Sequence, residues 1–150
     1  MFESKWFDGA TKALVLAALV CGSVQIVLGQ TASSETWKDG ATGLTWTVKD
    51  NGSDVNSGQA RDYCGNLRVG GFSDWRLPAI EELEAIYDKS AKKLYKTKGP
   101  IEMSNSCALS GTTNPTGEVW SFCFSYGGKT LARAQGHGSA GRALCVRKAE

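Results

Sequence analysis

The order of the elements predicted along this chain of 150 residues indicates an α+β fold. A strand comes first, two helices follow it, and after a long loop the chain ends in further strands. Because strands and helices are segregated and do not alternate, the pattern differs from that of α/β proteins with a parallel sheet. Four cysteines downstream of an apolar N-terminal run add the expectation of a small, disulfide-bonded domain in an exported protein.

The N-terminal segment has the three-part layout of a secretory signal peptide. Lys5 and Lys12 precede an uncharged apolar run at residues 13–28, and Gly29 provides a small residue for cleavage. As a helix this run would span about 24 Å, less than the roughly 30 Å of a hydrocarbon core. We expect a signal peptide over 1–29, no lipidation at Cys21, and no stable membrane span after processing. A retained membrane anchor is the alternative.

Cleavage after Gly29 would leave a flexible linker over 30–36 and one domain over 37–150. Its cysteines are Cys64, Cys107, Cys123 and Cys145. An even number in an exported chain favours two disulfides, and the spacing leaves all three pairings open. Metal binding is the alternative, but the chain has no C-x-x-C pair and one histidine, His137.

The first strand is predicted over residues 42–48, where Leu44, Trp46 and Val48 alternate with polar residues. The polar residues 33–38 before it are expected to be flexible. Residues 49–54 after it are rich in turn-forming side chains. The first strand is therefore expected to end in a turn before the first helix.

The first helix is predicted to begin at Asn56 or Ser57, either of which can cap its N-terminus. Its apolar residues recur at helical spacing, and the glycines at 70 and 71 end it. The face expected to be buried consists of Ala60, Tyr63, Cys64 and Leu67.

The second helix is predicted to follow Pro78, which suits a first helical turn because its missing N–H would be unpaired there. The glutamates at 81, 82 and 84 would lie near the positive end of the helix dipole. The face expected to be buried consists of Ile80, Leu83, Ile86 and Tyr87.

The C-terminal half is predicted to hold one long loop and two strands. Residues 99–117 are rich in Ser, Thr, Asn, Pro and Gly, so we expect a loop held by a disulfide through Cys107. Residues 118–124 and 142–147 are predicted strands. The glycines at 127–128 and 136–141 predict turns between them.

Basic residues gather in two clusters, although the net charge of +2 is too small to indicate a nucleic-acid partner. Residues 88–98 hold five lysines against one acid. The second cluster consists of Lys129, Arg133, Arg142, Arg147 and Lys148. Either cluster alone is typical of a solvated surface, whereas the two folded together would form one face for binding a polyanion.

Five segments of the chain carry a family resemblance. They are TGLTW (42–46), DNGSDVNSGQARDYCGNL (50–67), GGFSDWRLPAIEEL (70–83), VWSF (119–122) and RALCVRK (142–148). Together they resemble the C-terminal domain of the Legionella collagen-like adhesin (Lcl), a family of exported bacterial proteins. The Trp-Arg-Leu-Pro element is also similar to formylglycine-generating enzymes, with Ala79 where that pattern has a capping threonine.

The resemblance implies a C-type-lectin-like fold, in which two helices flank a small, mostly antiparallel sheet with many loops. It also implies two nested disulfides, Cys64–Cys145 and Cys107–Cys123. In such a fold Trp75 would anchor the core and Arg76 would hold the helix–sheet junction through an ion pair or hydrogen bond. Calcium-dependent sugar binding is not implied, because residues 114–120 contain neither of the triplets that such lectins use.

The leading function hypothesis is an exported, non-enzymatic binding or adhesion module for a polysaccharide, including a sulfated one, or another surface polymer. No nucleophile elbow, P-loop or His-Glu-x-x-His motif is present, and no cofactor or metal is expected. The expected partner is a glycosaminoglycan-like polyanion, and the sequence allows a homo-oligomer. The predicted contacts are Lys92, Lys93, Lys96, Lys98, Trp120, Arg133 and Arg142.

The alternative hypothesis is an oxidoreductase fold like that of the formylglycine-generating enzymes, active or degenerate. That chemistry needs a reactive cysteine pair. If all four cysteines of the domain are in structural disulfides, none remains for it. His137, which glycines flank, is expected to be a loop residue.

Overall fold

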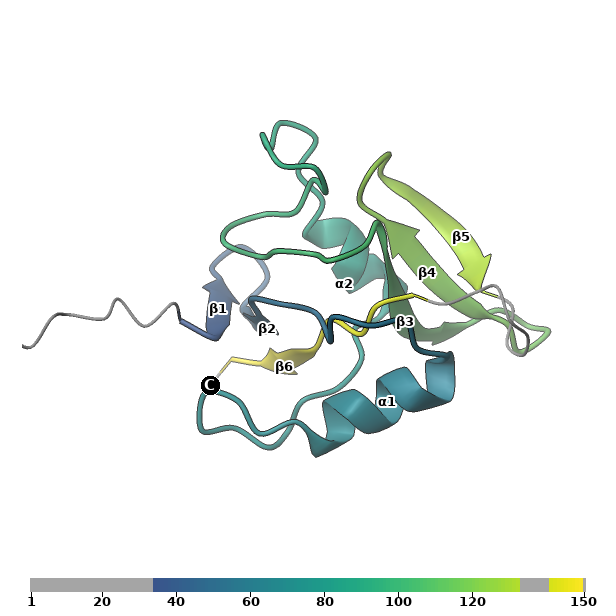
Figure 1. Ribbon diagram of the computed structural model, residues 1–150, viewed down its shortest axis with the longest axis horizontal. Coiled ribbons are helices and arrows are strands. Elements are labelled where there is room, and N and C mark those ends of the chain that lie inside the picture. The colour runs from purple at the N-terminus through teal and green to yellow at the C-terminus, as the bar shows by residue number, and fades with distance from the viewer. Residues whose placement is uncertain (1–33, 133–140, 150) are drawn as a thin grey trace, which may run out of the picture. The chain divides into compact units, whose positions relative to one another are not determined.

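The first hairpin and the last strand of the domain share one small sheet (Figure 1). In the computed structural model, which describes residues 34–132 and 141–149, β1 (Thr36–Asp39) pairs with β2 (Leu44–Thr47) and β2 pairs with β6 (Val146–Lys148). Both pairings are antiparallel, with Trp46 opposite Trp37 on one side and Val146 on the other. The C-terminal strand therefore lies beside the first hairpin.

The predicted signal peptide and most of the predicted linker lie outside the described residues, which belong to one unit that spans residues 32–150. Within the part that the structure describes, no helix is long and apolar enough to cross a membrane.

A second sheet consists of β3 (Cys107–Thr113), β4 (Val119–Cys123) and β5 (Gly128–Ala132), in that order and all antiparallel. The α+β prediction is confirmed, but the expectation of one sheet is wrong, since the strands form two. The long loop predicted over 99–117 is also wrong for residues 107–113, and β5 was not predicted. Small and polar residues dominate β3, so its pairing with β4 leaves no hydrophobic periodicity in the sequence.

The prediction of a flexible segment at residues 33–38 is wrong for residues 36–38, which belong to β1. The turn before β2 is closed by a hydrogen bond from the Gly43 N–H to the Asp39 carbonyl at 2.8 Å, with Gly43 at a φ of 68°. Trp37 then packs on Gly99, where an added Cβ would come within 2.6 Å of the indole. Backbone pairing and one aromatic contact form this strand, and neither requires an alternating pattern.

Helix α1 (Ser57–Asn66) begins as predicted, with Asn56 as its N-cap. The Asn56 side chain accepts a hydrogen bond from the Gln59 N–H, and the Gln59 side chain accepts one from the Asn56 N–H, both at 2.9 Å. Such a reciprocal cap satisfies two backbone donors that the helix itself cannot pair. Ala60 and Cys64 are buried, as the spacing predicts.

Helix α2 (Ile80–Ala85) follows Pro78 as predicted, although Pro78 lies before the N-cap residue Ala79 and so outside the first helical turn. Ala79 has no side-chain acceptor, but two other residues supply the missing partners. Thr112 Oγ1 in β3 accepts a hydrogen bond from the Ile80 N–H at 3.0 Å, and the Glu82 carboxylate accepts one from the Ala79 N–H at 2.7 Å. The second sheet therefore caps this helix.

The core has two parts. One lies between α2 and the two sheets, with the buried faces of α2, Phe122, Phe124 and Trp46. The other surrounds Cys64, Cys145 and Trp75. These two clusters fix both helices against the strands.

Trp75 and Arg76 have the structural roles that the resemblance implied. Trp75 is 3% exposed, and its indole N–H donates to the Val69 carbonyl at 3.2 Å. The Arg76 backbone exchanges hydrogen bonds with Val146 in β6, at 3.0 and 2.9 Å. Its guanidinium donates two bonds of 2.8 Å to the Glu82 carboxylate, which lowers the pKa of Glu82 below its usual value. This pair joins α2 to the C-terminal strand.

Candidate functional site

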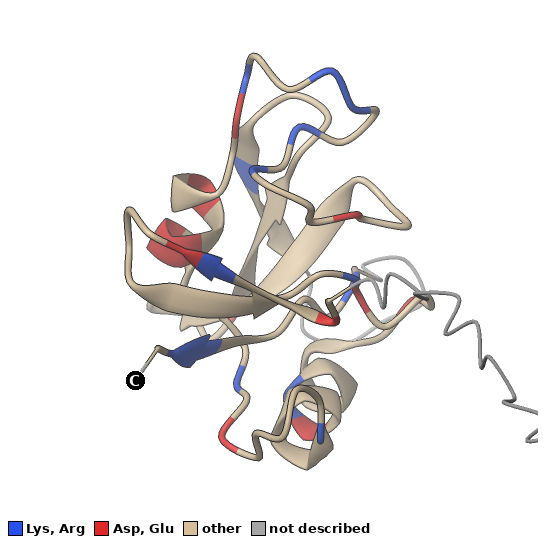
Figure 2. Ribbon diagram, turned by 90° about the vertical axis from the view of Figure 1, so that its left-hand side faces the viewer, with Lys and Arg blue, Asp and Glu red and all other residues tan. Residues whose placement is uncertain are grey.

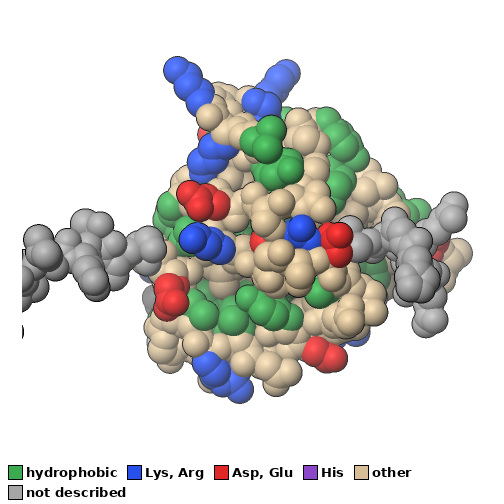
Figure 3. All heavy atoms as spheres, viewed as in Figure 1, with side chains coloured by type: hydrophobic (Ala, Val, Ile, Leu, Met, Phe, Trp, Pro, Cys, Tyr) green, Lys and Arg blue, Asp and Glu red, His purple; other side chains and the backbone are tan. Residues whose placement is uncertain are grey.

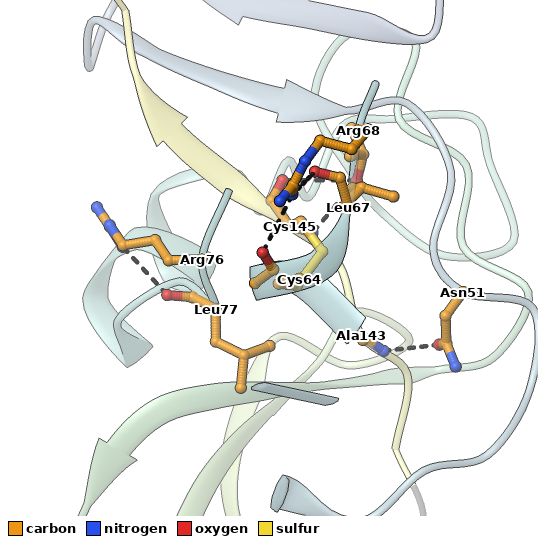
Figure 4. Close-up of a disulfide and its surroundings, with 10 residues drawn as sticks. Asn51, Cys64, Leu67, Arg68, Arg76, Leu77, Ala143 and Cys145 are labelled. Atoms are coloured by element: carbon orange, nitrogen blue, oxygen red, sulfur yellow. Dashed lines mark hydrogen bonds between the residues drawn. A yellow bond between two sulfur atoms is a disulfide. The ribbon is translucent and has the colours of Figure 1, made fainter. Parts of the chain in front are cut away.

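Two disulfides form the frame on which the candidate surfaces lie. Cys64 in α1 is bonded to Cys145, directly before β6, and Cys107 in β3 is bonded to Cys123 at the end of β4. These are the pairs that the resemblance implied, and they leave no free thiol among the described residues. Figure 4 shows the first disulfide, with Arg68 turned back to donate to the Leu67 carbonyl at 2.8 Å at the end of α1.

The loop that follows α2 carries the lysine segment, which we define as residues 88–98; Figure 2 shows its basic residues together at the top. Its backbone is tied down at several points. The Asp88 N–H donates to the Lys96 carbonyl at 2.9 Å, the Lys98 N–H to the Ile86 carbonyl at 2.8 Å, and the Lys96 N–H to the Phe124 carbonyl at 3.0 Å. The segment is therefore a defined loop with a fixed path.

The five lysines of this segment have different surroundings. Lys93 Nζ donates to the Gly99 carbonyl and, at 3.0 Å, to the Ile101 carbonyl, and Lys96 Nζ donates to the Ala91 carbonyl at 3.4 Å. These two ammonium groups help to close the loop. Lys89 and Lys92 are exposed, and neither forms an ion pair with any described residue. Both are thus available to a ligand.

Asp88 is the one acid of the lysine segment, and its own neighbours satisfy it. Its carboxylate accepts hydrogen bonds from the Ser90 hydroxyl at 2.6 Å and the Ser90 N–H at 2.9 Å. These bonds lower the pKa of Asp88, and the positive charge of Lys98 adds to the effect. Asp88 remains ionised near neutral pH, and the segment keeps a net positive charge.

The cations of the C-terminal third are mostly paired, which contradicts the expectation of one joint basic face. Arg142 is 12% exposed and donates from Nε to Ser104 Oγ at 2.7 Å, while Nη1 forms an ion pair with Asp54. Lys129 Nζ lies 2.7 Å from the Glu84 carboxylate, which raises the pKa of Lys129. In Figure 2 the basic residues of β6 lie well below the lysine segment. Arg133 lies outside the described residues.

Arg147 is the most buried of these cations among the described residues. Its side chain is 4% exposed, its Nε lies 2.6 Å from the Asp74 carboxylate, and its guanidinium carbon lies 3.7 Å from the centroid of the Phe72 ring. The hydrogen bond from Arg147 lowers the pKa of Asp74. A planar guanidinium can form an ion pair and stack on an aromatic ring at once, so this residue is structural.

Trp120 is half-buried in β4 and packs against the core cluster that contains Phe122. It lies opposite Leu131 of β5, and its carbonyl accepts a hydrogen bond from Ser110 Oγ at 2.7 Å. Much of the indole is therefore used in packing, which limits it as a platform for a sugar ring.

Tyr63 is the residue that the sequence analysis misplaced. The helical spacing assigned it to the buried face of α1, but the structure leaves it 37% exposed, beside a cavity of about 250 Å³. Burial of the rest of the ring raises the pKa of Tyr63, and the nearby charge of Asp50 adds to this. Because α1 is short and only Ala60 and Cys64 face the core fully, helical periodicity alone could not separate Tyr63 from them.

The loop that contains Asp50 and Asp54 is occupied by protein donors. Asp50 accepts hydrogen bonds from the Ser104 N–H at 2.6 Å and its hydroxyl at 2.7 Å, while Asp54 pairs with Arg142. No described group of three or more His, Cys, Asp or Glu residues could hold a metal ion. In this loop Arg142 supplies the positive charge beside Asp54, and Ser104 supplies the hydrogen bonds to Asp50.

The comparisons with known proteins support the resemblance. The family model of the Lcl C-terminal domain matches residues 35–147, which include both helices and all four bonded cysteines. No curated protein and no solved structure matches the chain. The chain belongs to the Lcl C-terminal domain family.

Proposed function

We propose that this chain is an exported, non-enzymatic adhesion module that binds anionic polysaccharides, including sulfated ones, through the lysine segment. The observation that carries the proposal is the fixed path of residues 88–98, which holds Lys89 and Lys92 exposed beside three further lysines. A loop that is already ordered loses little conformational entropy when it binds. Repeated positive charge on such a loop suits a polymer with repeated negative charge.

The family supports the adhesion part of this proposal, and the disulfides support export. Two disulfides persist in oxidising compartments and are rare in the cytosol. A C-type-lectin-like architecture is part of the proposal. It agrees with the pairing of β6 beside the first hairpin and with the bond from α1 to Cys145.

The predicted contacts change in three respects. Arg142 is withdrawn, because its guanidinium is committed to Asp54 and Ser104. Lys89, which the sequence analysis counted in its cluster but did not name as a contact, joins Lys92 as a contact. Lys93 and Lys96 contribute positive charge while their ammonium groups hold the loop.

The test is binding of heparin and fucoidan, measured by calorimetry for the wild-type chain and the double variant Lys89→Glu/Lys92→Glu. We expect charge reversal to weaken binding by roughly tenfold or more at low salt. Wild-type binding should also weaken between 0.1 and 1 M salt, as the Debye length falls from about 10 Å to about 3 Å.

The matched control is Lys148→Glu, which reverses an exposed lysine of β6 outside the lysine segment. It should leave heparin affinity within about twofold of the wild type. Equal losses in both variants would mean that net charge, and not this loop, controls binding. Salt-independent binding would contradict the polyanion proposal.

The oxidoreductase alternative predicts at least one reactive or readily reduced cysteine. Titration of the native chain with a thiol reagent distinguishes this alternative from the adhesion proposal. The adhesion proposal predicts no reactive thiol from Cys64, Cys107, Cys123 or Cys145, since each is in a disulfide.

A further inference from the structure

A groove on the face that carries α1 has no part in the function proposed above. Figure 3 shows a strip of hydrophobic side chains across the lower half of this face, with charged side chains at its margins. Two hollows, of about 250 and 570 Å³, lie beside α1, and Tyr63 and Leu67 line both of them. Tyr63 therefore forms a ridge between two neighbouring hollows.

The upper wall of the groove is held by backbone hydrogen bonds. The Val48 N–H donates to the Glu35 carbonyl at 2.9 Å, and the Asn51 N–H donates to the Ala143 carbonyl at 3.1 Å. The Asn51 side-chain oxygen accepts the Ala143 N–H at 2.8 Å, as Figure 4 shows. The lower wall is α1, which the Cys64–Cys145 bond fixes to the same C-terminal segment. Both walls are therefore preformed.

The side chains around Tyr63 combine an aromatic ring with planar hydrogen-bonding groups. Gln59, Asp62 and Asn66 of α1 supply amide and carboxylate groups to one hollow. The Lys49 ammonium lines the other, beside Asp50, whose carboxylate is already bonded to Ser104. Tyrosine offers a large, rigid contact area of mixed polarity at a low cost in conformational entropy. Amide and carboxylate groups beside it accept and donate hydrogen bonds in the directions that ring hydroxyls require.

The charged side chains that line the two hollows limit which kind of ligand can bind there. Glu35, Asp50 and Asp62 line the hollows with Lys49 and Arg68, so acidic side chains slightly outnumber basic ones. A sulfated or carboxylated polymer would meet these carboxylates at short range, and like charges repel. A wholly apolar ligand would leave the polar walls without hydrogen-bond partners, which is costly.

From this arrangement we propose that the Tyr63 groove is a second glycan site, which binds uncharged sugar rings. The apolar C–H face of a ring packs on Tyr63, and its hydroxyls bond to the amides and carboxylates of the walls. Small-molecule sites are typically about 300–1,000 Å³. One hollow, at about 250 Å³, lies just below this range and the other, at about 570 Å³, lies within it, so the pair suits one ring on each side of Tyr63. The proposal does not depend on polyanion binding by the lysine segment.

The test is a titration of the isotope-labelled full chain with cellohexaose, laminarihexaose, mannohexaose and chitohexaose, followed by NMR. At least one probe should shift the amide signals of Tyr63, Leu67 and Val69 without shifting those of residues 88–98. Tyr63→Ala should weaken that binding at least tenfold. Tyr63→Phe, which keeps the ring, should bind within about threefold of the wild type.

The control variant is Tyr126→Ala, which removes a tyrosine that is 64% exposed and lies outside the groove. It should leave the affinity for the uncharged probe unchanged, as should Lys89→Glu/Lys92→Glu. High salt should leave it unchanged as well, which separates this site from the polyanion site. The proposal is overturned if no probe shifts the groove signals, or if Tyr63→Ala, with its fold confirmed by circular dichroism, binds as the wild type does.

Discussion

The lysine segment and the cations of the C-terminal third differ in what surrounds them, although both are runs of basic residues in the sequence. Arg142 and Arg147 lie in a segment that the fold buries, and each meets an aspartate from a distant part of the chain. Lys89 and Lys92 lie on a loop whose own acid, Asp88, is already hydrogen-bonded to Ser90. These two arginines stabilise the fold, and the exposed lysines of the lysine segment are left for a partner.

This difference shows why a basic run in a sequence is weak evidence for a binding surface. Arginine pairs with carboxylates through a planar guanidinium that tolerates burial, whereas a lysine ammonium is strongly hydrated. Arginines in a buried segment therefore find carboxylate partners, whereas lysines on a loop stay in water. The availability of a charge therefore depends on the partners that the fold provides.

The largest expected effect on stability concerns the two disulfides. Cys64–Cys145 is next to β6, and Cys107–Cys123 is next to Phe124, to which the lysine segment is hydrogen-bonded. Cys64→Ala/Cys145→Ala removes the bond between two cysteines that are 81 residues apart, one of them directly before β6. Chain entropy predicts that the free energy of unfolding then falls by about 4.5 kcal/mol. Cys107→Ala/Cys123→Ala removes the bond between two cysteines that are 16 residues apart, and the free energy of unfolding should fall by about 3 kcal/mol. Urea unfolding of both variants measures this, and a reversed order would contradict the comparison.

The next effect concerns the paired cations. Arg147→Ala should lower the free energy of unfolding by about 2–3 kcal/mol, because the change removes a buried ion pair and a stacking contact. The loss should fall at the low end for buried pairs, since the Asp74 carboxylate that remains is 57% exposed and stays hydrated. The control Lys148→Ala, at the exposed neighbouring residue, should stay within about 0.5 kcal/mol of the wild type. Equal thermal stability of the two variants would show that Arg147 is not structural.

A smaller effect is expected from acid. The pKa of Glu82 is lowered in the folded chain by Arg76, so this carboxylate contributes stability that is fully present above its ordinary pKa of 4.5. That contribution is lost as the pH falls through the lowered value, because the unfolded chain then binds the proton more readily. Glu82→Gln should flatten part of the fall in melting temperature below pH 4.5. The control is Glu81→Gln, at an exposed glutamate outside the Arg76 pair; a matching change there would contradict the assignment.

The smallest effect on stability is expected in the lysine segment. Lys92→Ala should change the free energy of unfolding by less than about 0.5 kcal/mol, as exposed substitutions usually do. The same variant should measurably weaken heparin binding. Lys93→Ala is the matched change, because its ammonium bonds to the Gly99 and Ile101 carbonyls and its loss should loosen the loop. Thermal melts that rank Lys92→Ala below Lys93→Ala would contradict the division between exposed and loop-closing lysines.

Much of the local structure could be predicted from the sequence. The Asn56 cap and the buried Ala60 and Cys64 of α1 followed from spacing, as did the buried face of α2. The predicted strands at 118–124 and 142–147 contain β4 and most of β6. Each of these elements buries one face, and a buried face leaves a hydrophobic period in the sequence. The disulfide pairing came from the family resemblance, because spacing alone left three pairings open.

The candidate contacts were harder to predict. Lys92 is exposed as the charge run suggested, but Arg142 is held by Asp54, and Tyr63 of α1 is 37% exposed. The arginine and its aspartate are 88 residues apart, and no local pattern links them. Tyr63 shares the lining of a cavity with residues 47–50, which its helical spacing does not predict.

The sequence by itself determined the α+β order, the start of α1 and the presence of paired cysteines, because capping, periodicity and residue counts are local properties. Only the tertiary structure decided that β1 and β3 are strands, that Thr112 caps α2 across 32 residues, and that Arg142 and Arg147 are paired with aspartates. Each of these depends on a hydrogen bond or ion pair with a distant segment. Such partners lie side by side only after the chain has folded, so their energies leave no periodic pattern in the sequence.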